Sequence, residues 1–360
     1  MEMMLLEECC EILDSMRIPI TASNRKEGIY PYYGANGIQD HVADYIFDDE
    51  LVLLAEDGGN FGSKTRPIAY RVSGKCWVNN HAHVLKPKEG LNVDFLCYSL
   101  MFYNTEGLVN GATRQKLTQT TMRKMLIPNL SIENQLYIVN QLNKLLKIIE
   151  LRKKEIQQLD NLTKARFVEM FGDPVANDKG WKTKPLLDMG KCKNGMNFHY
   201  DDSGVEISCL GVGDFKDLSV IDNTKKLSIV SLNEMPSEEY LLKDGDIVFV
   251  RSNGNKDLVG RSLAIYPGNL PTTFSGFCIR YRIHDDEITV PYLLRVLKME
   301  SMRKKMAGRG ANIQNLNQQI LGTLVIPVPP IELQNQFSDF TQAIDKSKVI
   351  KYISTQKLCT

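Results

Sequence analysis

The most informative side chains of this sequence are polar groups gathered around glycine turns in both halves of the chain. Arg, Lys, Asn and Gln, together with nearby Ser and Thr hydroxyls, offer donors and acceptors that can hydrogen-bond to the edges of DNA bases. In the first half the candidates are Asn60, Lys64, Arg66, Arg114, Gln115, Lys116, Thr118 and Gln119. In the second half they are Arg251, Ser252, Asn253, Asn255, Lys256, Arg261, Arg309, Asn312, Gln314 and Asn315. Each residue alone is equally explained as a solvated surface group, so the clustering carries the prediction.

No catalytic motif accompanies these groups. The chain has no GxxxxGK[ST] phosphate loop, no HExxH metal motif and no Asn-Pro-Pro-Tyr type motif of an adenine methyltransferase. His81 and His83 would share one face of a strand, but no third metal ligand is evident, which favours a structural role. A metal-dependent nuclease is an alternative that would use Asp201, Asp202, Asp214 and Lys216. Because short acidic patterns arise often by chance, the sequence predicts no catalytic residue and no bound metal.

The composition is typical of a soluble globular protein with two domains. The chain has 360 residues, of which 43% are hydrophobic and 24% charged, and no apolar run is long enough to cross a bilayer. Residues 1–6 are followed by two glutamates and do not resemble a secretory signal, so a cytoplasmic location is expected. The net charge is only +1, which means that any DNA-binding site must be a local patch.

The chain contains an internal repeat at an offset of 199 residues, without gaps in its best stretch. The matched residues of the first copy are Gly111, Ala112, Gln115, Leu117, Gln119, Ile127, Pro128, Ile132, Glu133 and Gln135. They recur as Gly310, Ala311, Gln314, Leu316, Gln318, Ile326, Pro327, Ile331, Glu332 and Gln334. Fainter echoes join 52–60 to 248–255, and Ser73, Gly74 and Cys76 to Ser275, Gly276 and Cys278. A period near 200 residues indicates two copies of a whole module, at 1–171 and 172–360.

Each module is expected to be an α+β domain followed by a long helix. Strand-like runs bounded by glycine and polar turns lie at 51–54, 68–72, 76–78, 247–250 and 277–283. A proline-containing connector then leads into apolar residues spaced three and four apart, at Val139, Leu142, Leu146, Ile149, Ile156 and Leu159. A helix over 131–170 would be about 50 to 60 Å long. The second copy, from Ile331 to about Ile353, carries a similar stripe, so the two helices are predicted to bury each other rather than each pack on its own domain.

The ordered pair of copies resembles the specificity subunits of type I restriction-modification enzymes, over essentially the whole chain. The resemblance is carried by 79–84, 111–117 and 310–316, by Ile127-Pro128 and Ile326-Pro327 with Glu133, Gln135, Glu332 and Gln334, and by Phe171-Gly172-Asp173-Pro174. It implies target-recognition domains at 1–130 and 172–329. It also implies conserved helices at 131–171 and 330–360, which would pair as an antiparallel coiled coil. Thr360 corresponds to Asn161, so the second helix is expected to be shorter than the first by about ten residues. The coiled coil is then expected to be lopsided or truncated.

The resemblance also implies a function and a set of partners. Each domain would read one half of a bipartite DNA site, and the two half-sites should differ because the two copies differ. The expected partners are double-stranded DNA, two modification (methyltransferase) subunits and restriction (translocase and nuclease) subunits, with no membrane. No cofactor is expected on this chain, while the partner subunits would use S-adenosylmethionine, ATP and magnesium. Besides the nuclease, the other alternative is a coiled-coil protein scaffold that does not read DNA.

Overall fold

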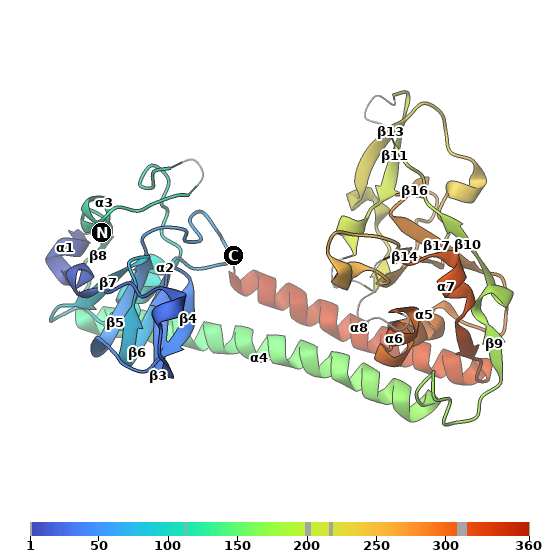
Figure 1. The fold of residues 1–360 in the computed structure, drawn as a ribbon, viewed down its shortest axis with the longest axis horizontal. Coiled ribbons are helices and arrows are strands. Elements are labelled where there is room, and N and C mark those ends of the chain that lie inside the picture. The colour runs from blue at the N-terminus through green and yellow to red at the C-terminus, as the bar shows by residue number, and fades with distance from the viewer. Residues whose placement is uncertain (1, 112–113, 199–202, 216–218, 308–314, 360) are drawn as a thin grey trace. The chain divides into compact units, whose positions relative to one another are not determined.

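The computed structural model describes residues 2–111, 114–198, 203–215, 219–307 and 315–359. The chain forms two compact units, Met1–Glu150 and Leu151–Thr360, called the first and second unit below. Each contains a mixed sheet with helices beside it, which confirms the α+β prediction (Figure 1). Among the helices of the described residues, none is long and apolar enough to cross a membrane.

The first unit is built around a six-stranded sheet with the order β2-β7-β5-β6-β3-β4. Its strands are β2 (Cys10–Ile12), β3 (Glu27–Gly34), β4 (Gly37–Val42), β5 (Phe47–Ala55), β6 (Ala69–Val78) and β7 (Ala82–Pro87). Neighbours are antiparallel except β3 and β6. Residues 51–55 of β5 are fully buried because apolar side chains cover both faces of the sheet. Val52 and Leu54 face one cluster and Leu51 and Leu53 the other, as the alternation along a strand requires.

The first unit also contains several short helices and a separate two-stranded sheet. They are α1 (Leu6–Cys9), α2 (Val93–Met101), α3 (Gln119–Arg123) and the two-stranded pair β1 (Met3–Leu5) and β8 (Leu126–Pro128). The 40-residue helix α4 (Ile132–Phe171) follows and begins within one residue of its predicted start.

The second unit has a five-stranded sheet with the order β10-β17-β14-β15-β12 and a smaller one with the order β13-β11-β16. The larger sheet comprises β10 (Gly190–Asn194), β12 (Val220–Ile221), β14 (Asp246–Val250), β15 (Ser262–Ile265) and β17 (Cys278–Ile283). The smaller sheet comprises β11 (Val205–Leu210), β13 (Ser228–Leu232) and β16 (Thr272–Phe274). The remaining elements are the pair β9 (Thr183–Pro185) and β18 (Val325–Pro327) and the helices α5 (Val290–Lys298), α6 (Glu300–Ala307), α7 (Gln318–Gly322) and α8 (Ile331–Cys359).

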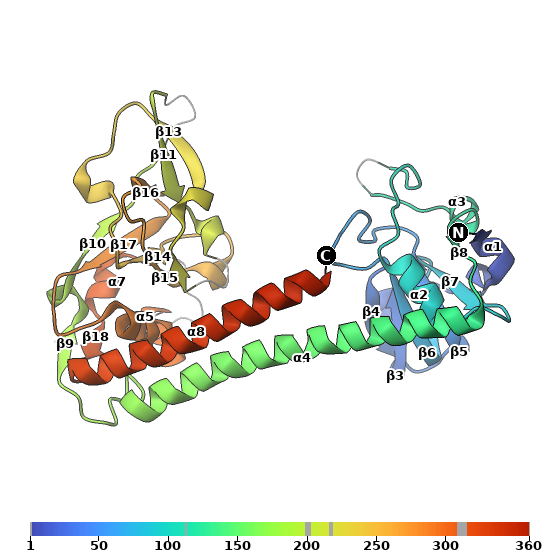
Figure 2. The same ribbon diagram turned by 180° about the vertical axis from the view of Figure 1, so that it is seen from behind.

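Within the second unit, α8 lies alongside the C-terminal part of α4 (Figures 1 and 2). The Phe337 ring of α8 packs at centroid distances of 5.4 and 5.7 Å from the Phe167 and Phe171 rings of α4. Further along α8, Lys348 Nζ lies 2.7 Å from Asp160 Oδ1. Contacts that advance along α8 while receding along α4 mean that the helices are antiparallel, which confirms the predicted coiled-coil pairing. The second helix extends to Cys359, past the end of its apolar stripe near Ile353.

The sequence repeat is also a repeat of structure. The pairs α3 and α7, β8 and β18, and the first residues of α4 and α8 are each separated by 199 residues. Gln135 and Gln334 are 1% and 0% exposed and make equivalent bonds. Each side-chain oxygen accepts from the backbone N–H of a helix N-cap, Asn92 before α2 and Thr289 before α5, at 2.8 Å. The repeated glutamine therefore joins α4 to α2 in the first unit and α8 to α5 in the second.

Two details of the sequence pattern differ from the structure. The runs 68–72 and 76–78 belong to one strand, β6, which continues through Gly74 at a φ of 74°. Glycine tolerates that backbone conformation at no steric cost. The echo of Cys76 in Cys278 is not structural, because Cys76 lies on β6, whereas Cys278 lies on β17, which pairs with β14 as β7 pairs with β5.

Candidate nucleic-acid interface

The 114–119 segment of the first unit crosses the end of β5 and presents its side chains around one buried anchor. Leu117 is fully buried, and its backbone N–H donates to the Glu56 carbonyl at 2.7 Å. The Gln115 carbonyl accepts from the Gly58 N–H at 3.2 Å. Arg114, Gln115 and Lys116 are exposed. The anchor thus fixes the backbone while three predicted DNA-contacting side chains face solvent.

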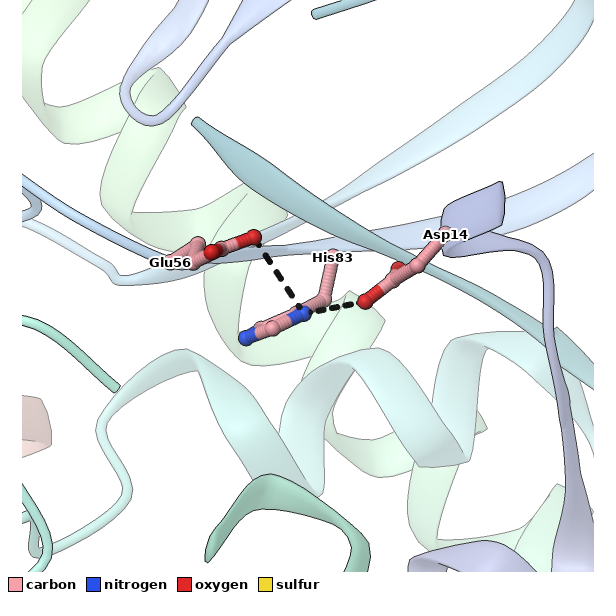
Figure 3. Close-up of side chains that lie close together, drawn as sticks. All are labelled: Asp14, Glu56 and His83. Carbon is pink, nitrogen blue, oxygen red and sulfur yellow. Dashed lines mark hydrogen bonds and ion pairs between the residues drawn. The ribbon is translucent and has the colours of Figure 1, made fainter. Parts of the chain in front are cut away.

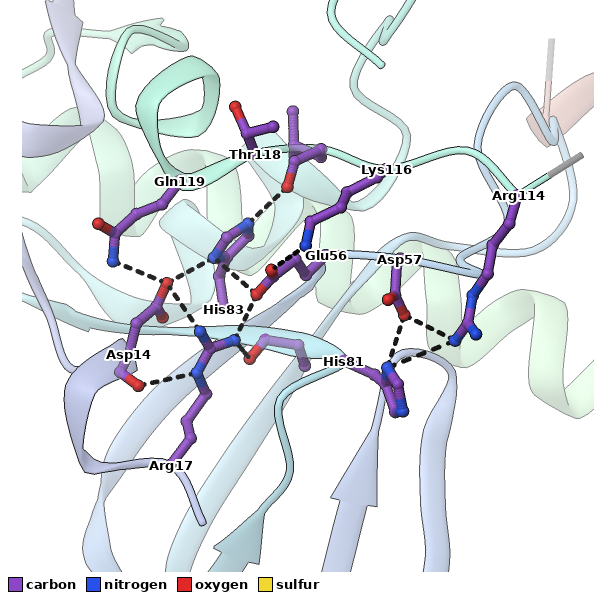
Figure 4. Close-up of polar contacts among 12 residues, drawn as sticks. Asp14, Arg17, Glu56, Asp57, His81, His83, Arg114, Lys116, Thr118 and Gln119 are labelled. Carbon is purple, nitrogen blue, oxygen red and sulfur yellow. Dashed lines mark hydrogen bonds and ion pairs between the residues drawn. The ribbon is translucent and has the colours of Figure 1, made fainter. Parts of the chain in front are cut away.

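Arg114 is held by hydrogen bonds from one nitrogen of its guanidinium group. Its Nη2 donates to Asp57 Oδ1 at 2.8 Å and lies 3.4 Å from His81 Nδ1, which itself lies 2.6 Å from the same Asp57 oxygen (Figure 4). The Arg114 side chain remains 60% exposed. Gly58, at a φ of 62°, passes close beneath it, and a Cβ there would lie 3.3 Å from Arg114 Nε. Arg114 is therefore oriented but keeps donors free for an acceptor arriving from solvent.

Of the other polar side chains of the segment, some are exposed to solvent and others are hydrogen-bonded to protein groups. Lys116 Nζ pairs with Glu56 Oε1 at 3.0 Å and is 50% exposed. Gln119 Nε2 donates to Asp14 Oδ2 at 3.0 Å. The Thr118 hydroxyl accepts from a backbone N–H in the first turn of α3 and is the N-cap of that helix. Thr118 and Gln119 thus have structural contacts, and their contact with DNA stays a prediction.

A second group of predicted residues lies on the loop after β5. Asn60 Nδ2 donates to the Pro67 carbonyl at 3.3 Å and braces the loop. Lys64 and Arg66 are exposed on it. This loop and the 114–119 segment both adjoin the end of β5.

Beneath the segment lies a buried group of charges, Asp14, Arg17, Glu56 and His83, called the ion cluster below. The ligand atoms of Asp14, Glu56 and His83 lie within 4.8 Å of one another, close enough to hold a metal ion (Figure 3). However, Arg17 Nη1 lies 2.6 Å from Glu56 Oε2, and Arg17 Nη2 lies 3.5 Å from Asp14 Oδ2. Because an arginine already neutralises these carboxylates, the cluster fits an ion-pair network and not a metal site.

Both carboxylates of the ion cluster are held in the charged form. Burial alone would raise the pKa of Asp14, but the hydrogen bond and charge of His83 and the Val84 N–H lower it below its ordinary value. Burial also opposes ionisation of Glu56, and hydrogen bonds from Arg17 and Lys116 lower its pKa in the same way. These partners come from distant parts of the chain, so no spacing pattern in the sequence indicated the cluster.

The second unit places Leu316, the counterpart of Leu117, in the same position. Leu316 is fully buried, and its N–H donates to the Arg251 carbonyl at 2.8 Å. Arg251 follows β14 directly, as Glu56 follows β5, and Arg251 N–H donates to the Phe277 carbonyl at 2.7 Å. The Glu56 N–H donates to the His81 carbonyl at 2.9 Å in the equivalent bond. The candidate interfaces of the two units are therefore built on one plan.

Several residues of the second unit that were predicted to contact DNA stabilise turns through side-chain hydrogen bonds. Asn253 Oδ1 accepts from the Asn255 N–H at 2.8 Å, and Asn255 Oδ1 accepts from the Asp257 N–H at 3.0 Å. Arg251 Nη1 donates to the Gly276 carbonyl at 3.4 Å. Ser252 is half-buried beside Arg251, Arg261 is half-buried and Asn315 is exposed. For all of them, DNA contact stays a prediction.

Some predicted residues lie outside the described part of the chain. These are Arg309, Asn312 and Gln314 of the candidate interface, and Asp201, Asp202 and Lys216 of the nuclease alternative. The side chain of Lys256 is likewise not described. Asp214, the remaining nuclease candidate, accepts from the Gly211 N–H at 2.9 Å and closes a turn.

A family model described as the type I restriction modification DNA specificity domain matches residues 1–161 and again 178–356. The chain belongs to this family. A Haemophilus influenzae protein named as a type I restriction enzyme specificity subunit is 29% identical and aligns over 98% of this chain and 89% of its own length. The StySPI specificity subunit of Salmonella potsdam is 24% identical over 79% of this chain and 65% of its own length.

Solved structures show the same fold. The type I restriction-modification S subunit from M. genitalium aligns over 99% of this chain and 92% of its own, with a TM-score of 0.54 and 15% identity. A chain from a study of complex assembly and conformational transition of the type I system aligns over 99% of this chain and 94% of its own, with a TM-score of 0.58 and 16% identity. Family membership favours the specificity subunit over the nuclease and scaffold alternatives.

Proposed function

We propose that this family member is the DNA-specificity subunit of a type I restriction-modification enzyme and reads a bipartite, asymmetric DNA site. The observation that carries the proposal is the duplicated placement of the 114–119 segment and its counterpart beside Leu316. In each unit a fully buried leucine donates its N–H to the carbonyl of the residue that follows the central strand. Exposed polar side chains differ between the copies, so the two units would read different bases.

The chain acts as a reader and a scaffold in this proposal. Methyl transfer and cleavage belong to two modification subunits and to restriction subunits, which use S-adenosylmethionine, ATP and magnesium. The complex works in the cytoplasm, where its DNA lies. Helix α4 has 40 residues and is about 60 Å long. A rod of that kind favours a fixed spacer between the half-sites.

Substitution of the three exposed residues of the first unit tests the proposal. An Arg114→Ala/Gln115→Ala/Lys116→Ala variant, assembled with modification subunits, should lose selection at one half-site by tenfold or more, because a good bidentate base contact discriminates by about 1–3 kcal/mol. Selection from a randomised DNA library measures this. A Lys26→Ala/Lys75→Ala variant removes the same charge from other exposed positions of the first unit and should keep both half-sites. An assembled triple variant that selects both half-sites as the wild type does would contradict the proposal.

A further inference from the structure

The ion cluster lies directly under the 114–119 segment and is almost closed to solvent. His83 is 0% exposed, and the side chains of Asp14, Arg17 and Glu56 are 3%, 12% and 13% exposed. Removing charges from water is costly, and a buried charge whose partner is removed is strongly destabilising. Charges kept in such a place must stay in contact with their partners, so the cluster is a rigid element.

His83 joins this element to the middle of the segment. Its Nδ1 lies 2.6 Å from Asp14 Oδ2, and its Nε2 lies 2.9 Å from the Leu117 carbonyl oxygen (Figure 4). The carboxylate and the carbonyl are both acceptors, so each ring nitrogen of His83 faces an acceptor to which it can donate when it carries a proton. One buried imidazole ring thus links strand β7 of the sheet to the anchor of the segment.

Other cluster members hold the residues on either side of Leu117. Glu56 accepts from Lys116 through its carboxylate and from Leu117 through its backbone carbonyl. Asp14 accepts from Gln119 at 3.0 Å. Three residues of one short exposed segment are therefore fixed by the same buried charges.

In the second unit, the described residue at the position equivalent to His83 is not a histidine. His83 pairs across the sheet with Leu54, two residues before Glu56. Ile279 pairs with Phe249, two residues before Arg251, so Ile279 occupies the position of His83 and is likewise fully buried. The anchoring bond from the leucine N–H forms in both units all the same. The bond from the leucine N–H therefore does not depend on a histidine at this place.

We propose that the ion cluster is a positioning device for base reading by the first unit, with His83 as its central positioning residue. This proposal rests on the proposed function. A segment held in its bound conformation before DNA arrives loses less conformational entropy on binding, so its contacts discriminate better between bases. Reading by the second unit does not depend on an equivalent residue.

A His83→Gln variant in the assembled complex tests the proposal, with selection from a DNA library in which both half-sites are randomised. The half-site read by the first unit is the one that the 114–116 triple variant affects. We expect base preference there to fall at least tenfold, while preference at the other half-site and binding to unrelated DNA stay within twofold of the wild type. A merely structural loss would lower binding without flattening base preference. His41→Gln, an exposed histidine of the same sheet, is the matched control.

Two further measurements keep the test decisive. If His83→Gln does not fold, Asp14→Asn retains the shape of the carboxylate, removes its charge and should weaken the same half-site alone. In protein labelled with ¹⁵N-histidine, one residue should show protons on both ring nitrogens, with signals absent from His83→Gln. Unchanged selection in a folded His83→Gln or Asp14→Asn variant, or equal loss at both half-sites, would overturn the positioning proposal. A wild-type complex that selects no bipartite site would instead overturn the proposed function.

Discussion

At the residue scale, the same side-chain chemistry serves both DNA reading and local structure. Arg114 and Lys116 are oriented by carboxylates yet keep exposed donors, whereas Thr118 is the N-cap of α3 and Asn253 closes a turn. Asn, Ser and Thr are favoured in all these places because their short side chains reach nearby backbone groups. Residue type alone cannot separate a base reader from a cap.

Lys298 of the second unit gives a prediction about stability. Burial, followed by the charges of Arg295 and Arg261, lowers its pKa to about 8, although Nζ donates to Ser219 Oγ at 2.7 Å. Below pH 8 the folded protein must hold a desolvated charge, which destabilises it relative to the unfolded chain. Lys298→Met should therefore raise the free energy of unfolding at pH 7 by about 1–3 kcal/mol, as measured by urea denaturation.

The pH dependence supplies the control for Lys298. Between pH 8 and the ordinary lysine value of 10.5, the unfolded chain binds more protons than the folded one, so the wild type gains stability as the pH rises. The advantage of Lys298→Met should shrink over that window. Lys304 is 75% exposed and pairs with Glu300. Lys304→Met should therefore change the free energy of unfolding by less than about 0.5 kcal/mol, both at pH 7 and across the window from pH 8 to 10.5. A Lys298→Met variant less stable than the wild type at pH 7 would exclude this account.

At the element scale, the sequence predicts best where a pattern is long or repeated. The start of α4, and strands β5, β14 and β17, were predicted to within a few residues because each follows a clear periodicity or apolar run. Strands such as β12, with two residues, and β16, with three, are too short to carry a pattern. The ion cluster escaped prediction because Asp14 and His83 meet only through tertiary contact, 69 residues apart.

The repeated glutamines give a prediction at this scale. Gln135→Leu keeps the volume but removes the partner of the Asn92 N–H and of the Gly90 and Leu130 carbonyls. Leaving these buried groups unpaired should cost about 2–4 kcal/mol and loosen the start of α2. Hydrogen-exchange mass spectrometry should show faster exchange in α2 and unchanged exchange in α5, where Gln334 is intact. Glu133→Ala, an exposed neighbour, should change neither, and equal protection of α2 in the glutamine variant would contradict the assigned role.

At the scale of the whole molecule, the internal repeat of the sequence allowed the two-module organisation to be predicted. An ungapped repeat covers the segment, the connector and the start of each long helix, and the structure keeps that order in both units. The copies differ at positions that the proposal assigns to specificity, among them His83 and Ile279, which occupy equivalent positions. A repeat reveals the shared framework, whereas the base read by each side chain depends on docking geometry that no spacing encodes.

We propose that two unlike readers on one chain recognise two separate half-sites. The most direct measurement is selection by the wild-type chain, assembled with its modification subunits, from a library of fully randomised duplex DNA. We predict two short and different blocks of selected bases, separated by an unselected spacer of constant length. A single continuous block, two blocks at variable separation, or no selected sequence would contradict the account.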